Sequence, residues 1–177
     1  YNESLKGGGV YYSSREDVNI FSSNISNNKA IGSKNNSGFG GGLFMEQYSG
    51  DLYVDNSIFE NNLAMEGGGI NARVTNVKIN KSDINNNTAT RGVGGGAYFN
   101  SDTIEISKNN INNNVAMDAL AGSFGGGIYI YSDYLIISDS SICGNSANNG
   151  GGIHLVITNW YNEYTISKII DSQIASN

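Results

Sequence analysis

The fold is decided by residues 67–89, which read GGGINARVTNVKINKSDINNNTA. This stretch opens with a glycine triplet, continues through two segments in which apolar and polar residues alternate, and closes on an Ile-x-x-Asn motif followed by Ala. Alternation with a period of two predicts short β-strands with one buried face. The same order of features recurs along the chain, so residues 67–89 are one copy of a structural repeat.

Both anchors of the repeat occur six times. The triplet and the apolar pattern after it read GGGVYY from Gly7, GGGLFM from Gly40, GGGINA from Gly67, GGGAYF from Gly94, GGGIYI from Gly125 and GGGIHL from Gly150. The second anchor reads ISNN from Ile25, FENN from Phe59, INNN from Ile84 and from Ile111, ICGN from Ile142 and IASN from Ile174. Two successive triplet spacings are 27 residues, a length suited to one coil of three short strands and three turns.

These spacings predict an all-β fold, a right-handed single-stranded parallel β-helix of about six coils, with residues 1–177 as a single β-helix domain. Strands of successive coils stack about 4.8 Å apart. The glycines permit positive φ angles and close approach of stacked backbones. The motif asparagines are expected to form a structural ladder. Asn tolerates the left-handed turn conformation, and its side-chain amide can form a hydrogen bond with the Asn one coil away. Its members are Asn28, Asn62, Asn87, Asn114, Asn145 and Asn177.

Composition excludes several classes of function. The net charge of −6 and the pI of about 4.6 provide no basic stripe for nucleic acid. One cysteine, Cys143, cannot form an intrachain disulfide or a multi-cysteine metal site. Within these 177 residues no apolar run approaches the roughly 20 residues of a transmembrane helix, and no stretch has the pattern of a signal peptide. We expect no metal site and no cofactor.

The alternation of GGG-apolar with (I/F)xxN resembles the GGA(I/L/V) and FxxN repeats of chlamydial polymorphic outer-membrane proteins. It is also similar to the adhesin-like β-helix proteins of methanogenic archaea. The third position of the triplet departs from that pattern, with Gly in place of Ala, and Phe occurs only at Phe59. The resemblance covers essentially the whole chain and implies an extracellular or cell-surface protein with a structural or adhesive role.

The alternative function is that of a polysaccharide-binding or polysaccharide-cleaving β-helix. A lyase or hydrolase needs carboxylates close together on an exposed strand face. The outward columns of the first strand place no two carboxylates in adjacent coils. Glu46 with Arg73 and Lys78 with Glu105 are expected to be cross-coil ion pairs, and His154 a surface aromatic. We therefore assign no catalytic residue.

Aromatic residues provide the sequence-based candidate for ligand binding. Rings in one outward column could lie against sugar rings or a protein partner, and the other interpretation is an outer surface covered by loops or by another subunit. The loops at 31–39 and 118–124 and the insertion at Trp160 and Tyr161 are alternative binding edges. The candidate aromatic face consists of Tyr11, Phe44, Tyr98, Tyr129 and Tyr131.

An exposed terminal coil presents an open strand edge, which repeat proteins usually cover with a cap. Neither terminal repeat of this sequence has the features of a cap. We therefore expect a segment of a longer solenoid or a protomer that stacks end to end into a fibre. The expected partners are further coils or copies of the chain, with a carbohydrate or a cell-surface protein as possible ligand.

Overall fold

The computed structural model describes residues 2–32, 38–46, 49–118, 122–157 and 166–177. Four parallel sheets are formed, named here in the order in which the chain meets them after each triplet. The first sheet contains β2 (Val10–Tyr12), β6 (Leu43–Glu46), β10 (Ile70–Arg73), β14 (Ala97–Asn100), β18 (Ile128–Ser132) and β21 (Ile153–Ile157). The second contains β3 (Val18–Phe21), β7 (Asp51–Asp55), β11 (Asn76–Asn80), β15 (Thr103–Ser107), β19 (Tyr134–Ser138) and β22 (Ile166–Ile170).

The two remaining sheets complete each coil. The third contains β4 (Asn24–Ser26), β8 (Ile58–Glu60), β12 (Asp83–Asn85), β16 (Asn110–Asn112), β20 (Ser141–Cys143) and β23 (Gln173–Ala175). The fourth contains β1 (Glu3–Ser4), β5 (Lys29–Ala30), β9 (Leu63–Glu66), β13 (Thr88–Val93) and β17 (Val115–Ala116). The expectation of three strands per coil was wrong, because the residues between the ladder Asn and the next triplet also pair.

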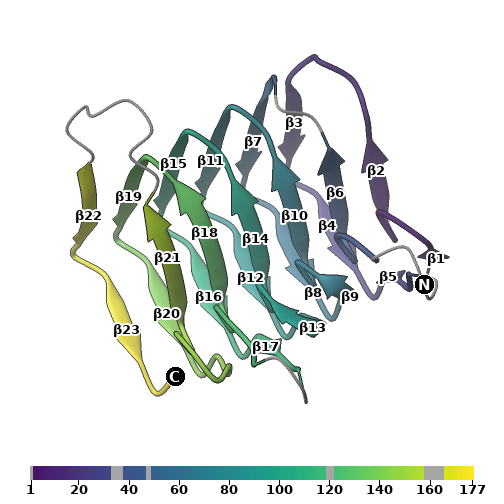
Figure 1. Ribbon diagram of the computed structural model, residues 1–177. Helices are drawn as coiled ribbons and strands as arrows, with labels where there is room; N and C mark the ends of the chain where they lie inside the picture. Colours follow the sequence, from purple (N-terminus) through teal and green to yellow (C-terminus); the bar gives the residue numbers. More distant parts are fainter. Residues whose placement is uncertain (1, 33–37, 47–48, 119–121, 158–165) are drawn as a thin grey trace.

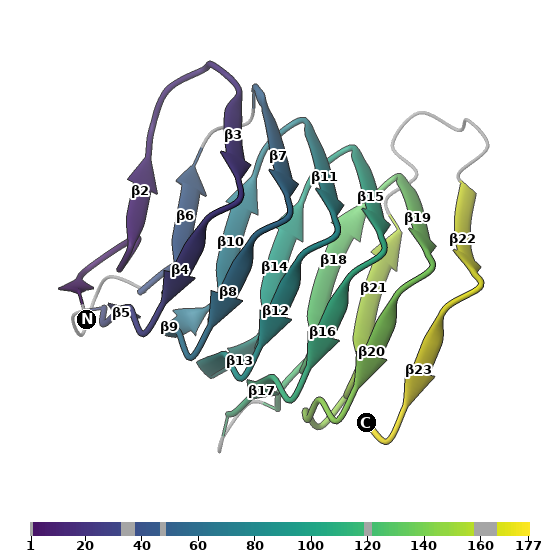
Figure 2. The same cartoon turned by 180° about the vertical axis from the view of Figure 1, so that it is seen from behind.

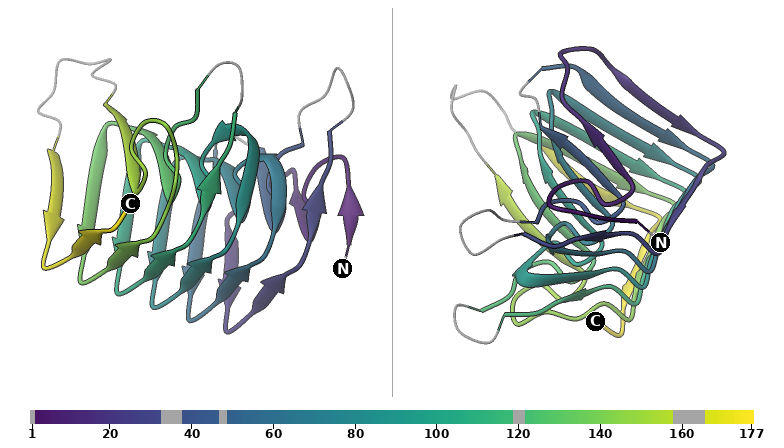
Figure 3. Two further views of the ribbon diagram at one scale, coloured as in Figure 1. Left: turned by 90° about the horizontal axis from the view of Figure 1, so that it is seen from below. Right: turned by 90° about the vertical axis from the view of Figure 1, so that its right-hand side faces the viewer.

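The chain winds as a right-handed parallel β-helix, which confirms the predicted fold class. In Figure 1 it ascends through the first sheet in front and descends behind, while it advances from the N-terminal coil at the right to the C-terminal coil at the left. Figure 2 shows the second and third sheets from the other side. The six repeats make about five complete turns, and the two termini lie at opposite ends of the column (Figures 1 and 3).

The core lies inside this column and is built from the inward residues of each strand. Register aligns Leu43, Ile70 and Ala97 in the first sheet, and all three are fully buried. Inward positions are more open in the two end coils: Val10, aligned with Leu43, is 38% exposed, and Leu155, at the second inward position of its strand, is 36% exposed. A coil covers these side chains on one side only, so the apolar interior reaches the surface at both end faces.

The glycine triplets allow the coils to approach closely at one corner. Gly67 has a φ of +61°, in the left-handed region, and a Cβ on Gly68 would lie 2.3 Å from the carbonyl oxygen of Gly95 in the next coil. No side chain fits at that distance. Positive φ thus belongs to the first residue of the triplet and close stacking to the second and third, since a Cβ on Gly69 would lie 2.7 Å from the carbonyl oxygen of Gly96.

The left-handed corner residue was predicted one position too late. The positive φ angles belong to Asn27, Asn61, Asn86 and Asn113, each of which precedes a ladder asparagine. The ladder residue itself turns its side chain into the column and is buried, as for Asn87 and Asn114. The two functions of the corner are therefore divided between neighbouring asparagines.

The asparagine ladder itself is confirmed. In each step Oδ1 of one Asn accepts hydrogen bonds from the backbone N–H and the side-chain amide of the Asn in the preceding coil, from Asn28 to Asn177. The amide nitrogen also donates to a carbonyl of the preceding coil, as Asn87 does to Phe59 at 2.9 Å. Buried polar groups are thus paired at this corner.

A second polar ladder runs along the corner between the second and third sheets, and the sequence reasoning missed it. Its side-chain oxygens accept hydrogen bonds from the backbone N–H one coil earlier, for example Ser82 Oγ from Ser57 at 3.1 Å. The members are Ser23, Ser57, Ser82, Asn109, Ser140 and Ser172. The signal was a Ser or Asn two residues before every motif Ile or Phe.

Candidate functional site

The aromatic residues predicted from the sequence share an outward column of the first sheet. Strand register aligns Tyr11, Phe44, Asn71, Tyr98, Tyr129 and His154. Tyr131 belongs to the next outward column, opposite Asn100 and Val156. The register therefore brings together the residues of the predicted face, and their accessibility decides what the face can bind.

Phe44 is fully buried, so its prediction as an exposed ring was wrong. Its ring stacks on Tyr11 at 5.6 Å and on Phe39 at 5.1 Å between centroids. The ammonium group of Lys6 lies 5.4 Å from the same ring. Phe39 and Lys6 precede successive triplets, and their side chains cover this part of the outer face; Tyr11 stays half exposed.

At the other end of the column the rings stack on one another. Tyr98 and Tyr129 are 5.4 Å apart with an interplanar angle of 6°, and Tyr129 and His154 are 5.1 Å apart at 12°. Both faces of the Tyr129 ring are thus occupied by its neighbours. Burial raises the pKa of the Tyr129 hydroxyl, and the charge of the nearby Tyr131 phenolate adds to this effect. A stack of this kind leaves ring edges, not ring faces, for a ligand.

Arg73 occupies the middle of the same face. Its guanidinium lies 5.0 Å from the ring of Phe39 and 5.6 Å from that of Tyr98, which are cation–π distances. Its ion pair is with Glu66 at 3.8 Å, whereas Glu46 pairs with Lys6 at 3.0 Å, so the expected pairing of Glu46 with Arg73 was wrong. Burial raises the pKa of Glu66, although Arg73 acts in the opposite direction.

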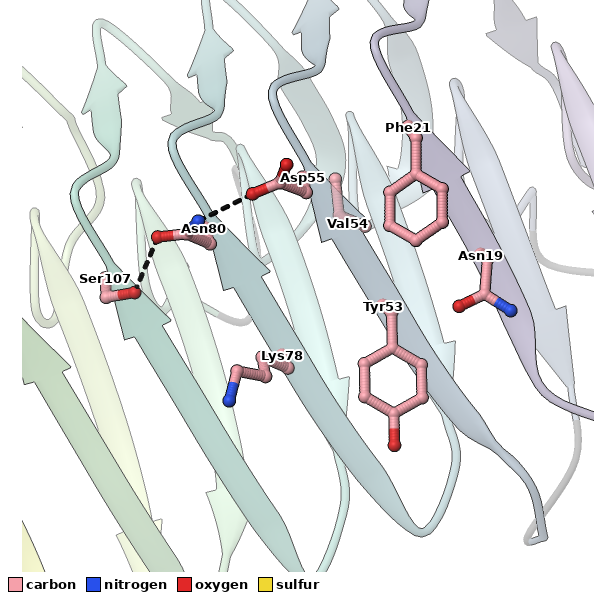
Figure 4. Close-up of a pocket in the computed structure, with 8 residues that line it drawn as sticks. All are labelled: Asn19, Phe21, Tyr53, Val54, Asp55, Lys78, Asn80 and Ser107. Carbon is pink, nitrogen blue, oxygen red and sulfur yellow. Dashed lines mark hydrogen bonds between the residues drawn. The ribbon is translucent and has the colours of Figure 1, made fainter.

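A groove of about 450 Å³ lies on the outer face of the second sheet (Figure 4). It crosses four consecutive strands, from β3 to β15, and therefore runs along the solenoid axis. The lining residues are Asn19, Phe21, Tyr53, Val54, Asp55, Lys78, Asn80 and Ser107. A second hollow of about 230 Å³ adjoins it and shares Tyr53 and Lys78.

Two aromatic rings form the floor of this groove. Phe21 is 58% exposed, and Figure 4 shows the rings of Phe21 and Tyr53 face-on in front of the strands. The register places Phe21 opposite Asp55, two residues beyond Tyr53 on the neighbouring strand. Two ring faces are thus offered side by side, in contrast to the stacked rings of the first sheet.

Polar groups border the rings in a connected row. Asn80 donates its amide N–H to Asp55 Oδ1 at 2.6 Å, and Ser107 donates its hydroxyl to Asn80 Oδ1 at 3.0 Å (Figure 4). On the other side the Tyr53 hydroxyl donates to Asp51 Oδ2 at 2.9 Å. That hydrogen bond, together with the charges of Asp51, Asp17 and Glu105, raises the pKa of Tyr53. The groove is therefore aromatic at its floor and rich in acceptors at its sides.

The predicted ion pair of Lys78 and Glu105 is confirmed, with Nζ and Oε2 3.0 Å apart. Phe21 and Tyr53 were not identified from the sequence. Both residues could have been found from the alternation in the second strand, because each stands next to an inward residue, Ile20 or Val54, and therefore points outward. From the outward positions of this strand, only the pair of Lys78 and Glu105 was predicted.

Within the described ranges no three His, Cys, Asp or Glu side chains are grouped as a metal site would require. The same residues contain no helix with the length and apolar character of a membrane span. The predicted binding edges at 31–39 and 118–124 are only partly described, and the insertion with Trp160 and Tyr161 lies outside the described residues. No protein-family model, curated protein or solved structure matches the chain.

Proposed function

We propose that this β-solenoid is a structural, adhesin-like protein at the cell surface or outside the cell, where its outer faces recognise a partner. One observation carries the proposal: the inward side chains repeat from coil to coil while the outward ones do not. At the first sheet the inward positions read Leu43, Ile70 and Ala97, and the outward ones Phe44, Asn71 and Tyr98. Repeat proteins vary in this way where a constant scaffold carries a specific binding surface.

The proposed role is recognition without catalysis. The carboxylates along the groove are engaged in ways that suit a binding surface: Asp51 accepts from Tyr53 and Asn76, and Glu105 pairs with Lys78. The repeats that resemble polymorphic outer-membrane proteins and archaeal adhesin-like proteins support the same role.

We further propose that the end faces pack against more coils of the same register, either in one longer solenoid or in a fibre of stacked copies. Support comes from the inward apolar side chains that the end coils expose, among them Val10 at one end and Ile169 at the other. Their strands also present backbone groups at an open sheet edge, which natural proteins cover.

Antibodies raised against the 177-residue chain test the proposed location on intact source cells. The proposal expects labelling without permeabilisation, and inhibition of cell attachment by the purified chain. Labelling that appears only after the cells are permeabilised contradicts it. Electron microscopy of the purified chain, with mass measurement, tests whether copies stack end to end.

A further inference from the structure

We propose that the groove on the second sheet binds a neutral glycan chain, which crosses β3, β7 and β11 along the solenoid axis with sugar rings on Phe21 and Tyr53. The assignment deepens the proposed recognition role and does not depend on where the protein is located. It also moves the binding site away from the aromatic column of the first sheet.

The first argument is the orientation of the rings. A sugar ring has an apolar C–H face, and that face packs against the face of an aromatic ring better than against its edge. Phe21 and Tyr53 show their faces in Figure 4, whereas Tyr129 has both faces covered by Tyr98 and His154. Adjacent parallel strands and a two-residue offset separate the two positions by about 8 Å, so both rings can contact one extended ligand.

The second argument is the set of hydrogen-bonding groups beside the rings. Sugar hydroxyls both donate and accept, and they match sites that mix carboxylates with amides. A carboxylate has several lone-pair sites, so Asp55 keeps acceptor capacity after its bond from Asn80. Two amide groups add to these: Asn80 lies beside Asp55 on the next strand, and Asn19 lies beside Tyr53, two residues before Phe21.

The third argument is charge, which selects the class of glycan. Of the described residues that line the two hollows, Lys78 alone is cationic, and it is already paired with Glu105. An acidic polysaccharide would bring its carboxylates close to Asp51, Asp55 and Glu105 without gaining an unpaired cation in the groove. Lys81 and Lys108 follow Asn80 and Ser107 at the corner and lie outside the lining of the groove. Because these two cations are near the groove, the test below includes an acidic glycan as a competing ligand.

Binding of the purified chain to neutral gluco-, manno- and galacto-oligosaccharides tests the assignment. Polygalacturonate serves as the acidic arm and chitosan oligomers as the cationic arm, all at one salt concentration. The variants are Phe21→Ala and Tyr53→Ala. The matched control is Tyr11→Ala, which removes a half-exposed ring from the first sheet. Thermal unfolding of each variant verifies that it is folded.

The proposal expects a neutral oligosaccharide to bind, with affinity about tenfold lower in either groove variant and unchanged in Tyr11→Ala. Binding to no neutral glycan overturns it, as does binding that both groove variants retain. Preference for the acidic or the cationic arm overturns the assignment to neutral glycans. If the natural chain binds no neutral glycan but antibodies label intact cells, the groove assignment is rejected and the proposed location is unaffected.

Discussion

Oδ1 of Asn87 accepts two hydrogen bonds from Asn62 in the preceding coil, at 2.9 Å from its backbone nitrogen and 3.0 Å from its side-chain nitrogen. One amide thus holds two coils in register at a buried corner. The ladder adds to the backbone hydrogen bonds of the four parallel sheets, which also join each coil to the next.

Replacement of Asn87 by Ala is expected to destabilise the fold by about 2–5 kcal/mol. The buried N–H of Asn62 and the carbonyl of Phe59 lose their partner. Asn86→Gly is the matched control, because the adjacent residue is exposed and left-handed, with a φ of 57°, a conformation that Gly adopts readily. Urea unfolding measures both, and equal effects would refute the importance of the ladder.

In the second ladder, the residue that one coil uses should be able to replace the residue that another coil uses at the same position. Asn109→Ser places there the residue that other coils use, and we expect a loss below about 1 kcal/mol. The hydroxyl can still accept from Ser82 and donate to the carbonyl of Ser107, as Ser82 does to Asn80, so only the bond from the Asn109 amide to the carbonyl of Ile79 is lost. Asn109→Ala leaves the buried N–H of Ser82 unpaired and should cost about 1–3 kcal/mol. A comparison of the two unfolding free energies decides; an equal loss would contradict the assigned role.

Close stacking of the triplets is tested with a pair of identical substitutions. Gly68→Ala places a Cβ 2.3 Å from the carbonyl of Gly95 in the middle of the column, and we expect failure to fold or strong destabilisation. Gly151→Ala is the matched control in the last triplet, where the nearest atom belongs to Asn177 at 2.9 Å and the end coil can shift. Thermal melting should show a much smaller effect for the control. The reverse order would argue against the stacked corner.

The raised pKa of Glu66 predicts the sign of a pH effect. A carboxyl whose pKa is higher in the folded state stabilises the fold below its unfolded value of about 4.5, and this contribution is lost as the pH rises through the folded value. Glu66→Gln mimics the neutral form. Relative to the natural chain, its free energy of unfolding should therefore rise as the pH increases from about 4 to about 8. A difference that is constant, or that falls, would contradict the assignment of burial as the dominant cause.

The sequence predicted the fold well because the repeat states each structural constraint six times. Alternation placed Ile70 and Ala72 inside the column, and the repeated Asn identified the ladder. It gave no account of what covers an outward residue, since the Phe39 ring that buries Phe44 comes from before the triplet. Nor could the partners of charged groups be predicted from register. Arg73 forms its ion pair with Glu66 on another sheet and not with Glu46, which lies opposite it on the neighbouring strand.

The groove illustrates a second limit of sequence reasoning. An outward column shows which residues lie side by side, but not whether an aromatic ring offers its face or its edge. Tyr98 and Tyr129 stack because they lie on adjacent strands in the same column, while Phe21 and Tyr53 are offset and leave their faces open. Ring orientation therefore separates the two aromatic surfaces only once the structure is known.

The most direct test of the glycan-binding claim is a crystal structure of the chain with a neutral oligosaccharide that binds in solution. We expect sugar rings on Phe21 and Tyr53, with hydroxyls hydrogen-bonded to Asp55 and Asn80. An oligosaccharide seated instead against Tyr98 and Tyr129 on the first sheet would contradict the account.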